Sequence, residues 1–135
     1  MTTFDQVDLT TAALCAWREN RGGRPVEDAL QSVLNVIRNR MLKMGETAYK
    51  ICTTHAQFSS MTMIDPETSL WPIEEDPIWI KSLMLAQQML NGTLIDITLG
   101  STNYYAPAGM KDGAAPSWAA HMTYVTTIAG QRFNN

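Results

Sequence analysis

The sequence predicts an α+β fold that is mainly helical, with a small antiparallel β-sheet or hairpin near the C-terminus. Apolar residues recur at helical spacing through most of residues 8–91, and glycine and proline separate these stretches. After Gly100 the sequence changes to β-prone residues. With 135 residues, 45% of them hydrophobic, the chain has the size of one domain spanning 1–135.

A first helix is expected to begin at a cap formed by Asp8 or Thr10 and to reach about Arg21. Residues 9–17 are apolar on nearly every side, which predicts a helix enclosed by the other helices. The glycine pair at 22–23 ends it.

The second helix opens at Pro25, carries the acids Glu27 and Asp28 in its first turn and ends at Gly45. Its apolar positions follow a helical period, which predicts an inward face made of Val26, Ala29, Leu30, Val33, Leu34, Ile37 and Met41.

A short third helix is expected from Thr47 to about Thr54. Residues 55–77 are rich in serine, threonine, proline and acids, which predicts a long loop with at most one short turn. Loops of that length in a domain of this size are usually functional.

The fourth helix follows Pro77 and stops at Asn91-Gly92. β-Strands are then expected within 102–105, 123–128 and 131–134, the last two joined at Ala129-Gly130. The inward face of the fourth helix is predicted to contain Ile78, Leu83, Met84, Ala86, Met89 and Leu90.

Composition excludes several classes of function. The net charge is −3 and no basic block appears, which argues against nucleic acid as a partner. Cys15 and Cys52 lie in apolar stretches without Cys-x-x-Cys spacing, so we expect buried thiols, with a disulfide between them left open. His55 and His121 stand alone, and we expect no metal site.

The N-terminal residues lack the basic and apolar pattern of a signal peptide, and no apolar run has the length of a membrane span. We therefore expect synthesis in the cytoplasm and no membrane insertion, so a target outside the cytoplasm would have to be reached by another route. The protein is also expected to be a monomer.

Glu19 is the first candidate for chemistry. On a helix, Ala12, Cys15 and Ala16 share its face, so its carboxyl group is expected against small apolar side chains. Such surroundings disfavour the charged form, so the group can hold a proton and act as a general acid. The alternative is a solvated residue at a helix end, paired with Arg18 or Arg21.

Six segments in the same order resemble the cell wall hydrolase family typified by the catalytic domain of spore cortex-lytic enzymes (SleB-like). They span nearly the whole chain. The segments are Glu19-Asn20-Arg21-Gly22, Asn39-Arg40, Gln57-Phe58-Ser59, Gly100-Ser101-Thr102-Asn103-Tyr104-Tyr105-Ala106, Pro116-Ser117-Trp118-Ala119 and Thr127-Ile128-Ala129-Gly130-Gln131-Arg132-Phe133.

The resemblance implies a lysozyme-like catalytic domain that degrades peptidoglycan without a cofactor. Family members so described are lytic transglycosylases, which cleave the bond between N-acetylmuramic acid and N-acetylglucosamine and leave 1,6-anhydromuramic ends. The single catalytic acid would be Glu19. This chain has Gly23 where the family commonly has a second Glu, and Asn103 where it commonly has His.

Ordinary glycosidases need two carboxyl groups, and the second is hard to find here. Asp96 is the best remaining candidate, although a turn-capping role is favoured for it. In a transglycosylase the C6 hydroxyl of muramic acid is the nucleophile, so one acid suffices. One alternative is a muramidase that hydrolyses the same bond, with Asp96 or a loop acid such as Asp65, Glu67 or Asp112 positioning water. Another is a non-catalytic wall-binding or virion assembly module. A bacteriophage lysin is one setting that fits.

Seven further residues are candidates for substrate binding. Tyr104, Tyr105 and Trp118 either offer flat faces to sugar rings or fill the core beneath the sheet. Gln57, Ser59, Thr102 and Asn103 offer hydrogen-bond donors and acceptors. The remaining notable side chains are expected to be structural: Phe58 in the core, Asn39 and Arg40 tying the second helix to the loop, and Trp71 and Trp79 in packing. The alternatives are substrate contact for Asn39 and Arg40 and a place at the rim of the groove for Trp71.

Overall fold

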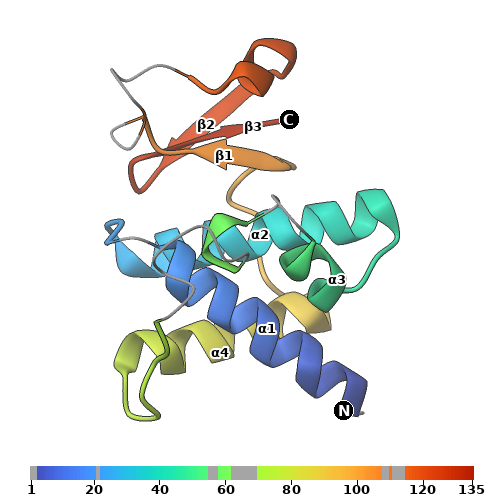
Figure 1. The fold of residues 1–135 in the computed structure, drawn as a ribbon, viewed down its shortest axis with the longest axis vertical. Coiled ribbons are helices and arrows are strands. Elements are labelled where there is room, and N and C mark those ends of the chain that lie inside the picture. Colours follow the sequence, from blue (N-terminus) through green and yellow to red (C-terminus); the bar gives the residue numbers. More distant parts are fainter. Residues whose placement is uncertain (1–2, 21, 55–57, 62–69, 108–109, 111–114) are drawn as a thin grey trace.

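Helices form the body of the molecule, and a small antiparallel sheet covers one side of it, which confirms the predicted fold class (Figure 1). The structure, a computed structural model, describes residues 3–20, 22–54, 58–61, 70–107, 110 and 115–135. Its elements are α1 (Thr3–Glu19), α2 (Val26–Met44), α3 (Ala48–Thr53), η1 (Ser59–Met61), α4 (Pro77–Asn91), β1 (Asn103–Tyr105), η5 (Ser117–His121), β2 (Tyr124–Ile128) and β3 (Gln131–Asn134).

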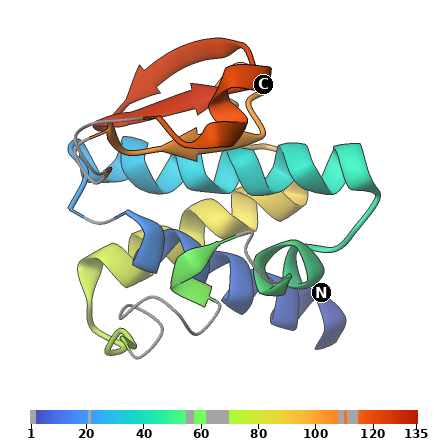
Figure 2. The same ribbon diagram turned by 45° about the horizontal axis from the view of Figure 1, so that its top comes forward.

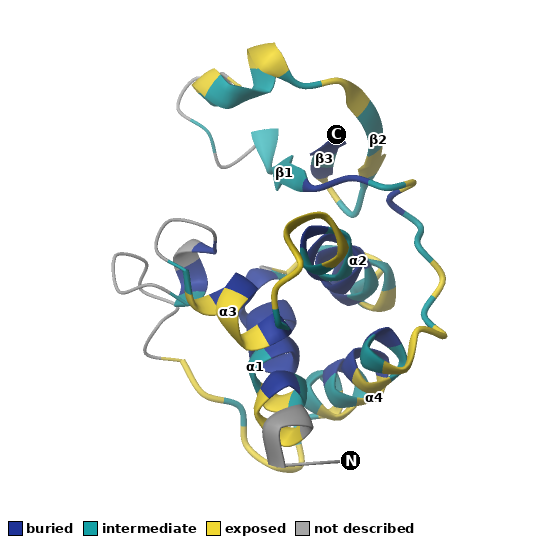
Figure 3. Cartoon of the chain, turned by 90° about the vertical axis from the view of Figure 1, so that its right-hand side faces the viewer, coloured by how far each residue is buried: buried dark blue, intermediate teal, exposed yellow. Residues whose placement is uncertain are grey.

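The elements form layers, with α2 between the sheet on one side and α1, α3 and α4 on the other (Figure 2). Seen nearly along α2, the buried side of each helix faces the centre of the body (Figure 3). The core is built from α1, α2, α3 and α4 together with Phe58 and Phe133. Because α1 packs against all three other helices, its predicted central place is confirmed.

The start of α1 differs from the prediction. The helix begins at Thr3 rather than at Asp8 or Thr10. Asp8 is buried inside it and accepts a hydrogen bond from the backbone N–H of Tyr49, 2.9 Å away, so it joins α1 to α3 instead of capping α1. The helix ends at Glu19, ahead of the expected end near Arg21, which lies outside the described residues.

Helix α2 is buried over more of its circumference than its apolar stripe predicts. The predicted inward residues are buried or packed against the core. Ser32, Asn35 and Val36 are buried as well. Asn35 bonds to the Ile95 carbonyl and the Ile97 N–H, at 3.1 and 2.9 Å, because the segment leading to the sheet runs along this second face.

The predicted ends of the later helices are largely confirmed. Thr47 caps α3, and the carboxylate of Asp76 caps α4, whose first residue is Pro77. In α4, however, Met84 is 44% exposed, whereas Leu85 is 3% exposed. The prediction for Met84 is wrong because the buried positions Ser82, Leu85, Ala86 and Met89 follow the i, i+3, i+4, i+7 stripe, which Met84 lies beside.

The sheet has the order β1-β3-β2, and both pairings are antiparallel. Tyr104 faces Phe133 and Tyr105 faces Arg132 in the pairing of β1 with β3. Since side chains alternate along a strand, Tyr104 and Phe133 point toward the helices, and Tyr105 and Arg132 point to the outer face. In the predicted long loop, the described residues contain η1 and a second turn at 74–75, closed by a hydrogen bond of 3.1 Å from the Asp76 N–H to the Ile73 carbonyl, so they exceed the single short turn that was predicted.

Candidate active site

The carboxyl group of Glu19, the last residue of α1, is buried with only 5% of the residue exposed. Its Oε1 accepts a hydrogen bond from the Tyr104 hydroxyl at 2.5 Å, and its Oε2 accepts one from the Ser60 backbone N–H at 3.2 Å. The end of α1, the turn η1 and the strand β1 therefore meet at one carboxyl group. This burial contradicts the alternative of a solvated helix-end residue.

The turn after Glu19 holds its backbone in place. The side-chain amide of Asn20 donates to the Trp17 carbonyl at 2.7 Å and accepts from the Gly22 N–H at 3.2 Å. Gly22 has φ +76°, a left-handed conformation that glycine adopts readily, and the Gly23 N–H donates to the Asn20 carbonyl at 2.7 Å. The chain thereby leaves α1 in a defined direction.

Arg18 positions the Ser60 N–H, the second hydrogen-bond donor to Glu19. Its Nε–H donates to the Leu70 carbonyl at 2.9 Å and its Nη1 to the Ser60 carbonyl at 3.1 Å. A buried arginine on α1 therefore holds η1 where the Ser60 N–H reaches Glu19.

The Arg18 guanidinium also lies 4.7 Å from the ring centre of Trp71. Trp71 is 69% exposed, so the expectation that it is a packing residue is wrong: the cation holds its ring at the surface. Trp79 packs against the core as expected.

Tyr104 reaches Glu19 from the core side of the sheet. Its ring packs between Phe58 and Phe133, with centroid distances of 6.4 and 5.4 Å, so its hydroxyl and not its face meets the site. Burial, together with the negative charge of Glu19 and the hydrogen bond to it, raises the pKa of Tyr104 well above its ordinary value. The hydroxyl therefore stays protonated and able to donate throughout the neutral range. Phe58 is buried, as predicted.

Arg40 supplies a positive charge near the Glu19 carboxyl group and the Tyr104 hydroxyl. Its Nε–H donates to the Thr102 carbonyl at 2.6 Å, and its guanidinium lies over the Phe58 ring at 4.7 Å. Burial lowers the pKa of Arg40, while the negative charge of Glu19 acts to raise it. Sequence reasoning expected a structural tie from α2, which exists, but missed that the cation also lies in the electrostatic surroundings of Glu19.

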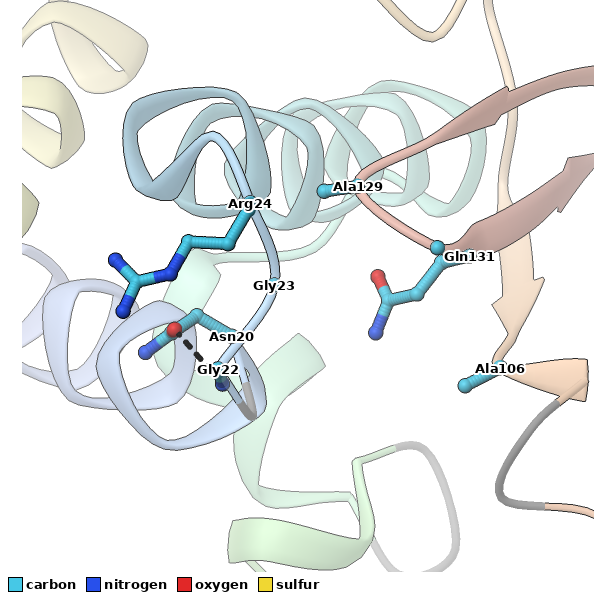
Figure 4. Close-up of a pocket in the computed structure, with 8 residues that line it drawn as sticks. Asn20, Gly22, Gly23, Arg24, Ala106, Ala129 and Gln131 are labelled. Carbon is cyan, nitrogen blue, oxygen red and sulfur yellow. Dashed lines mark hydrogen bonds between the residues drawn. The ribbon is translucent and has the colours of Figure 1, made fainter.

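A pocket of about 380 Å³ lies beside these residues, between the turn after α1 and the hairpin that joins β2 to β3 (Figure 4). It begins at Asn20, directly after Glu19, and its opposite wall includes Ala106, two residues after Tyr104. Figure 4 shows the side chain of Gln131 extending from the sheet toward the turn. The full lining is Asn20, Gly22, Gly23, Arg24, Ala106, Ala129, Gly130 and Gln131.

A family model described as Cell Wall Hydrolase matches residues 26–134. The chain belongs to the cell wall hydrolase family. The resemblance inferred from the six segments is thus confirmed, and so is the prediction of an enzyme that acts on the cell wall. The matched range begins after Glu19, so the match gives no support for a catalytic role of Glu19.

Solved structures have the same fold as this cell wall hydrolase. The catalytic domain of the germination-specific lytic transglycosylase SleB from Bacillus anthracis has a TM-score of 0.73 and 20% identity, with 100% of this chain and 99% of that chain covered. The catalytic domain of the Bacillus cereus SleB protein gives a TM-score of 0.70 and 22% identity over 96% and 91%. No curated protein sequence matches the chain.

The candidate binding residues of this cell wall hydrolase divide between two faces of the sheet. Tyr104 turns to Glu19, whereas Tyr105 lies on the outer face and meets Trp118 edge-on at 5.8 Å. Asn103 accepts a hydrogen bond from the Thr102 hydroxyl at 3.1 Å. Gln57 lies outside the described residues, as does the side chain of Ser59. A role of these residues in substrate binding stays a prediction.

The carboxylate of Asp96, the best candidate for a second acid, forms hydrogen bonds within the turn that follows it. It accepts hydrogen bonds from the Thr98 N–H and hydroxyl, the Gly100 N–H and the Asn39 amide, at 2.6 to 3.1 Å. Partial burial acts to raise the pKa of Asp96, but these hydrogen bonds outweigh it and hold that pKa below its usual value. The predicted turn-capping role is confirmed.

Other acids of this cell wall hydrolase have structural partners too. The Asp76 carboxylate caps α4 and accepts from the Trp17 indole N–H at 3.0 Å. Glu27 pairs with Lys81 at 3.5 Å on the surface. Asp65, Glu67 and Asp112 lie outside the described residues.

The two cysteines are free, buried and in contact. Burial and the hydrogen bond with Cys52 raise the pKa of the Cys15 thiol well above its ordinary value. Within the described ranges, no three His, Cys, Asp or Glu side chains are grouped as a metal site would need. Among the same residues no helix has the length and apolar character required to cross a membrane.

Proposed function

We propose that residues 1–135 form a single catalytic domain that cleaves the bond between N-acetylmuramic acid and N-acetylglucosamine in peptidoglycan as a lytic transglycosylase. Membership of the cell wall hydrolase family supports a wall polymer as substrate. The observation that carries the proposal is the sheltered carboxyl group of Glu19, with the Tyr104 hydroxyl on one oxygen and the Ser60 N–H on the other. The B. anthracis domain of the same fold is described as a lytic transglycosylase.

In the proposed reaction, Glu19 donates a proton to the glycosidic oxygen as the bond from C1 of muramic acid to that oxygen breaks. The C6 hydroxyl of the same sugar attacks C1 and forms the 1,6-anhydro ring, and Glu19 takes the hydroxyl proton. The acid ends in its starting state and no water is consumed. One carboxyl group suffices because the attack is intramolecular, which replaces a second bound reactant.

Hydrolysis of the same bond is the weaker candidate, because a second carboxyl group would have to position water or form a glycosyl-enzyme. The acid best placed by sequence, Asp96, already has four donors in its turn. A wall-binding module without activity is also disfavoured, since burying an acid beside two hydrogen-bond donors would bring such a module nothing.

Mass spectrometry of fragments released from purified sacculi tests the proposal. We expect fragments with anhydromuramic ends, which are lighter by one water than reducing ends. Glu19→Gln should abolish release while the thermal unfolding temperature changes little, because the amide keeps the shape but cannot exchange a proton. Glu46→Gln, at an exposed glutamate, is the matched control and should retain full activity.

Each other outcome has a distinct meaning. Reducing ends would establish the hydrolytic alternative. Full release by Glu19→Gln would move the catalytic acid elsewhere, and no release by the unmodified protein would favour the binding module.

A further inference from the structure

A second pocket of about 370 Å³ lies on the outer face of the sheet, beneath η5. Tyr105 and Arg132, which pair across β1 and β3, form its floor with Tyr124 and Asn134. Pro116 and Ser117, at the start of η5, form part of its cover. The reaction proposed above does not use this pocket, because Tyr104 faces Glu19 from the other side of the same strand.

Two polar atoms in this floor have no hydrogen-bond partner. Asn134 is only 3% exposed, and its Oδ1 is buried and unpartnered. The Nε of Arg132 is also buried and unpartnered, while its guanidinium stacks on the Tyr124 ring at 4.1 Å. Folded proteins seldom leave such buried atoms without a partner, so each of them calls for an explanation, and a bound ligand that supplies the missing donor or acceptor is one.

The two atoms define the chemistry of a ligand. Asn134 Oδ1 needs a donor, and Arg132 Nε–H needs an acceptor. Among the lining residues that the structure describes, Arg132 is the only charged one and none is an acid, so the acceptor best suited to them is a carboxylate. A short peptide combines an amide N–H with a carboxylate. In peptidoglycan the lactyl carboxyl group of a peptide-bearing muramic acid is consumed in the amide bond to the stem peptide, so on such a sugar the free carboxylates belong to the peptide.

We infer that this pocket binds the stem peptide of peptidoglycan through its amide and carboxylate groups. The inference rests on the proposed function and adds a second recognition element to it. The peptide N–H bonds to Asn134 and the carboxylate to Arg132, with the rings of Tyr105 and Tyr124 against its side chains. Because the two polar atoms are covered by protein, their side chains must turn toward the pocket when the peptide binds.

The pocket lies where a stem peptide attached to a sugar near Glu19 could reach it. β1 is an edge strand, and its neighbouring residues Tyr104 and Tyr105 point to Glu19 and to the pocket, respectively. Adjacent strands lie about 4.8 Å apart, and an extended tripeptide reaches roughly 10 Å. A stem peptide leaving a sugar near Glu19 can therefore pass around this edge.

The test measures binding without catalysis. Glu19→Gln protein labelled with nitrogen-15 is titrated with the synthetic tripeptide L-alanyl-γ-D-glutamyl-meso-diaminopimelate, and amide and arginine Nε–H signals are followed by NMR. We expect the Asn134 side-chain amide and the Arg132 Nε–H to shift. Adding Arg132→Met should raise the Kd at least tenfold, whereas Lys43→Met, the same charge change at an exposed site, should leave it unchanged.

Several outcomes would overturn the inference: no shift at the pocket, shifts confined to other residues, or equal affinity in the Arg132→Met and Lys43→Met proteins. If chitotetraose shifts the pocket signals and the tripeptide does not, the occupant is glycan. If Arg132→Met fails to fold, the NMR signals that shift in the Glu19→Gln protein, in which Arg132 is intact, still show whether the tripeptide binds at the pocket. Cleavage of sacculi without tripeptide binding overturns this inference alone, and binding without any cleavage overturns only the proposed function.

Discussion

A buried carboxyl group needs hydrogen-bond partners, and Glu19 obtains them from residues far away in the chain. Leaving a charged group unpaired inside a protein is strongly unfavourable, so a buried acid with well-placed donors indicates a site that the fold maintains. The donors are the hydroxyl of Tyr104 and the backbone of Ser60. The hydroxyl is the more informative, because a point substitution removes it without disturbing the backbone.

Replacing Tyr104 with phenylalanine should lower the rate of fragment release about 10- to 100-fold. The ring would still pack between Phe58 and Phe133, so the loss is confined to one hydrogen bond to an acid, about 1.5–3 kcal/mol. The rate is measured on sacculi by mass spectrometry. Tyr49→Phe, at a tyrosine 48% exposed, controls for the loss of a hydroxyl. An unchanged rate in Tyr104→Phe would remove the hydroxyl from the mechanism.

The turn between α1 and α2 joins Glu19 to the sheet. A Cβ atom added at Gly23 would lie 3.0 Å from the Ala29 Cβ, 3.1 Å from the Asn20 carbonyl and 3.2 Å from the Ala129 carbonyl. The turn and the β2-β3 hairpin are therefore in close contact at one wall of the pocket beside Glu19. The same crowding disfavours a side chain at position 23, where the family commonly has a Glu.

Gly23→Ala should lower the free energy of unfolding by about 1–3 kcal/mol, since overpacking pushes neighbouring backbone apart. It should also reduce fragment release, because the hairpin moves away from the turn. Gly45→Ala is the control: its φ of +65° makes an alanine strained, yet nothing lies within 4 Å of the added atom. We expect Gly45→Ala to lose stability and keep activity. Urea unfolding measures the stability of both proteins, and release assays measure their activity. Full activity in Gly23→Ala would show that fragment release does not depend on the contact between the turn and the hairpin.

On the scale of the whole molecule, the core beside the site contains two groups that resist ionisation. Burial raises the pKa of both Cys15 and Tyr104 well above their ordinary values. At alkaline pH the unfolded chain releases these protons, near pH 8.5 for cysteine and 10 for tyrosine, while the folded protein keeps them. The folded state then binds more protons than the unfolded state, so stability falls as pH rises.

We expect the free energy of unfolding to decrease from about pH 8.5 upward, with a slope approaching about 1.4 kcal/mol per pH unit for each retained proton. Urea unfolding at a series of pH values between 7 and 11 measures the slope. Tyr104→Phe should flatten the part above pH 10, and Cys15→Ala the part that begins near pH 8.5. A profile that stays level to pH 11 would mean that neither group is shielded from ionisation.

Much of the fold and part of the site were predictable from the sequence because their causes are local. The glycines at 45 and 92 end α2 and α4 through their own backbone freedom, and the change to β-prone residues marks the sheet. Glu19 was identifiable because the apolar residues on its face and the turn after it lie within a few positions. Such patterns act between neighbours in the chain and do not depend on how distant elements pack.

The surroundings of Glu19 were decided only by the tertiary structure. Its donors are 41 and 85 residues away, so their meeting depends on how η1 and β1 pack on the helices. The same holds for Arg40 near the acid and for the exposed ring of Trp71, which an arginine on α1 holds at the surface. Local sequence patterns predict the secondary structure and burial that a residue favours. Which distant residues come into contact depends on how the segments pack, and this packing makes Tyr104 a hydrogen-bond donor to Glu19.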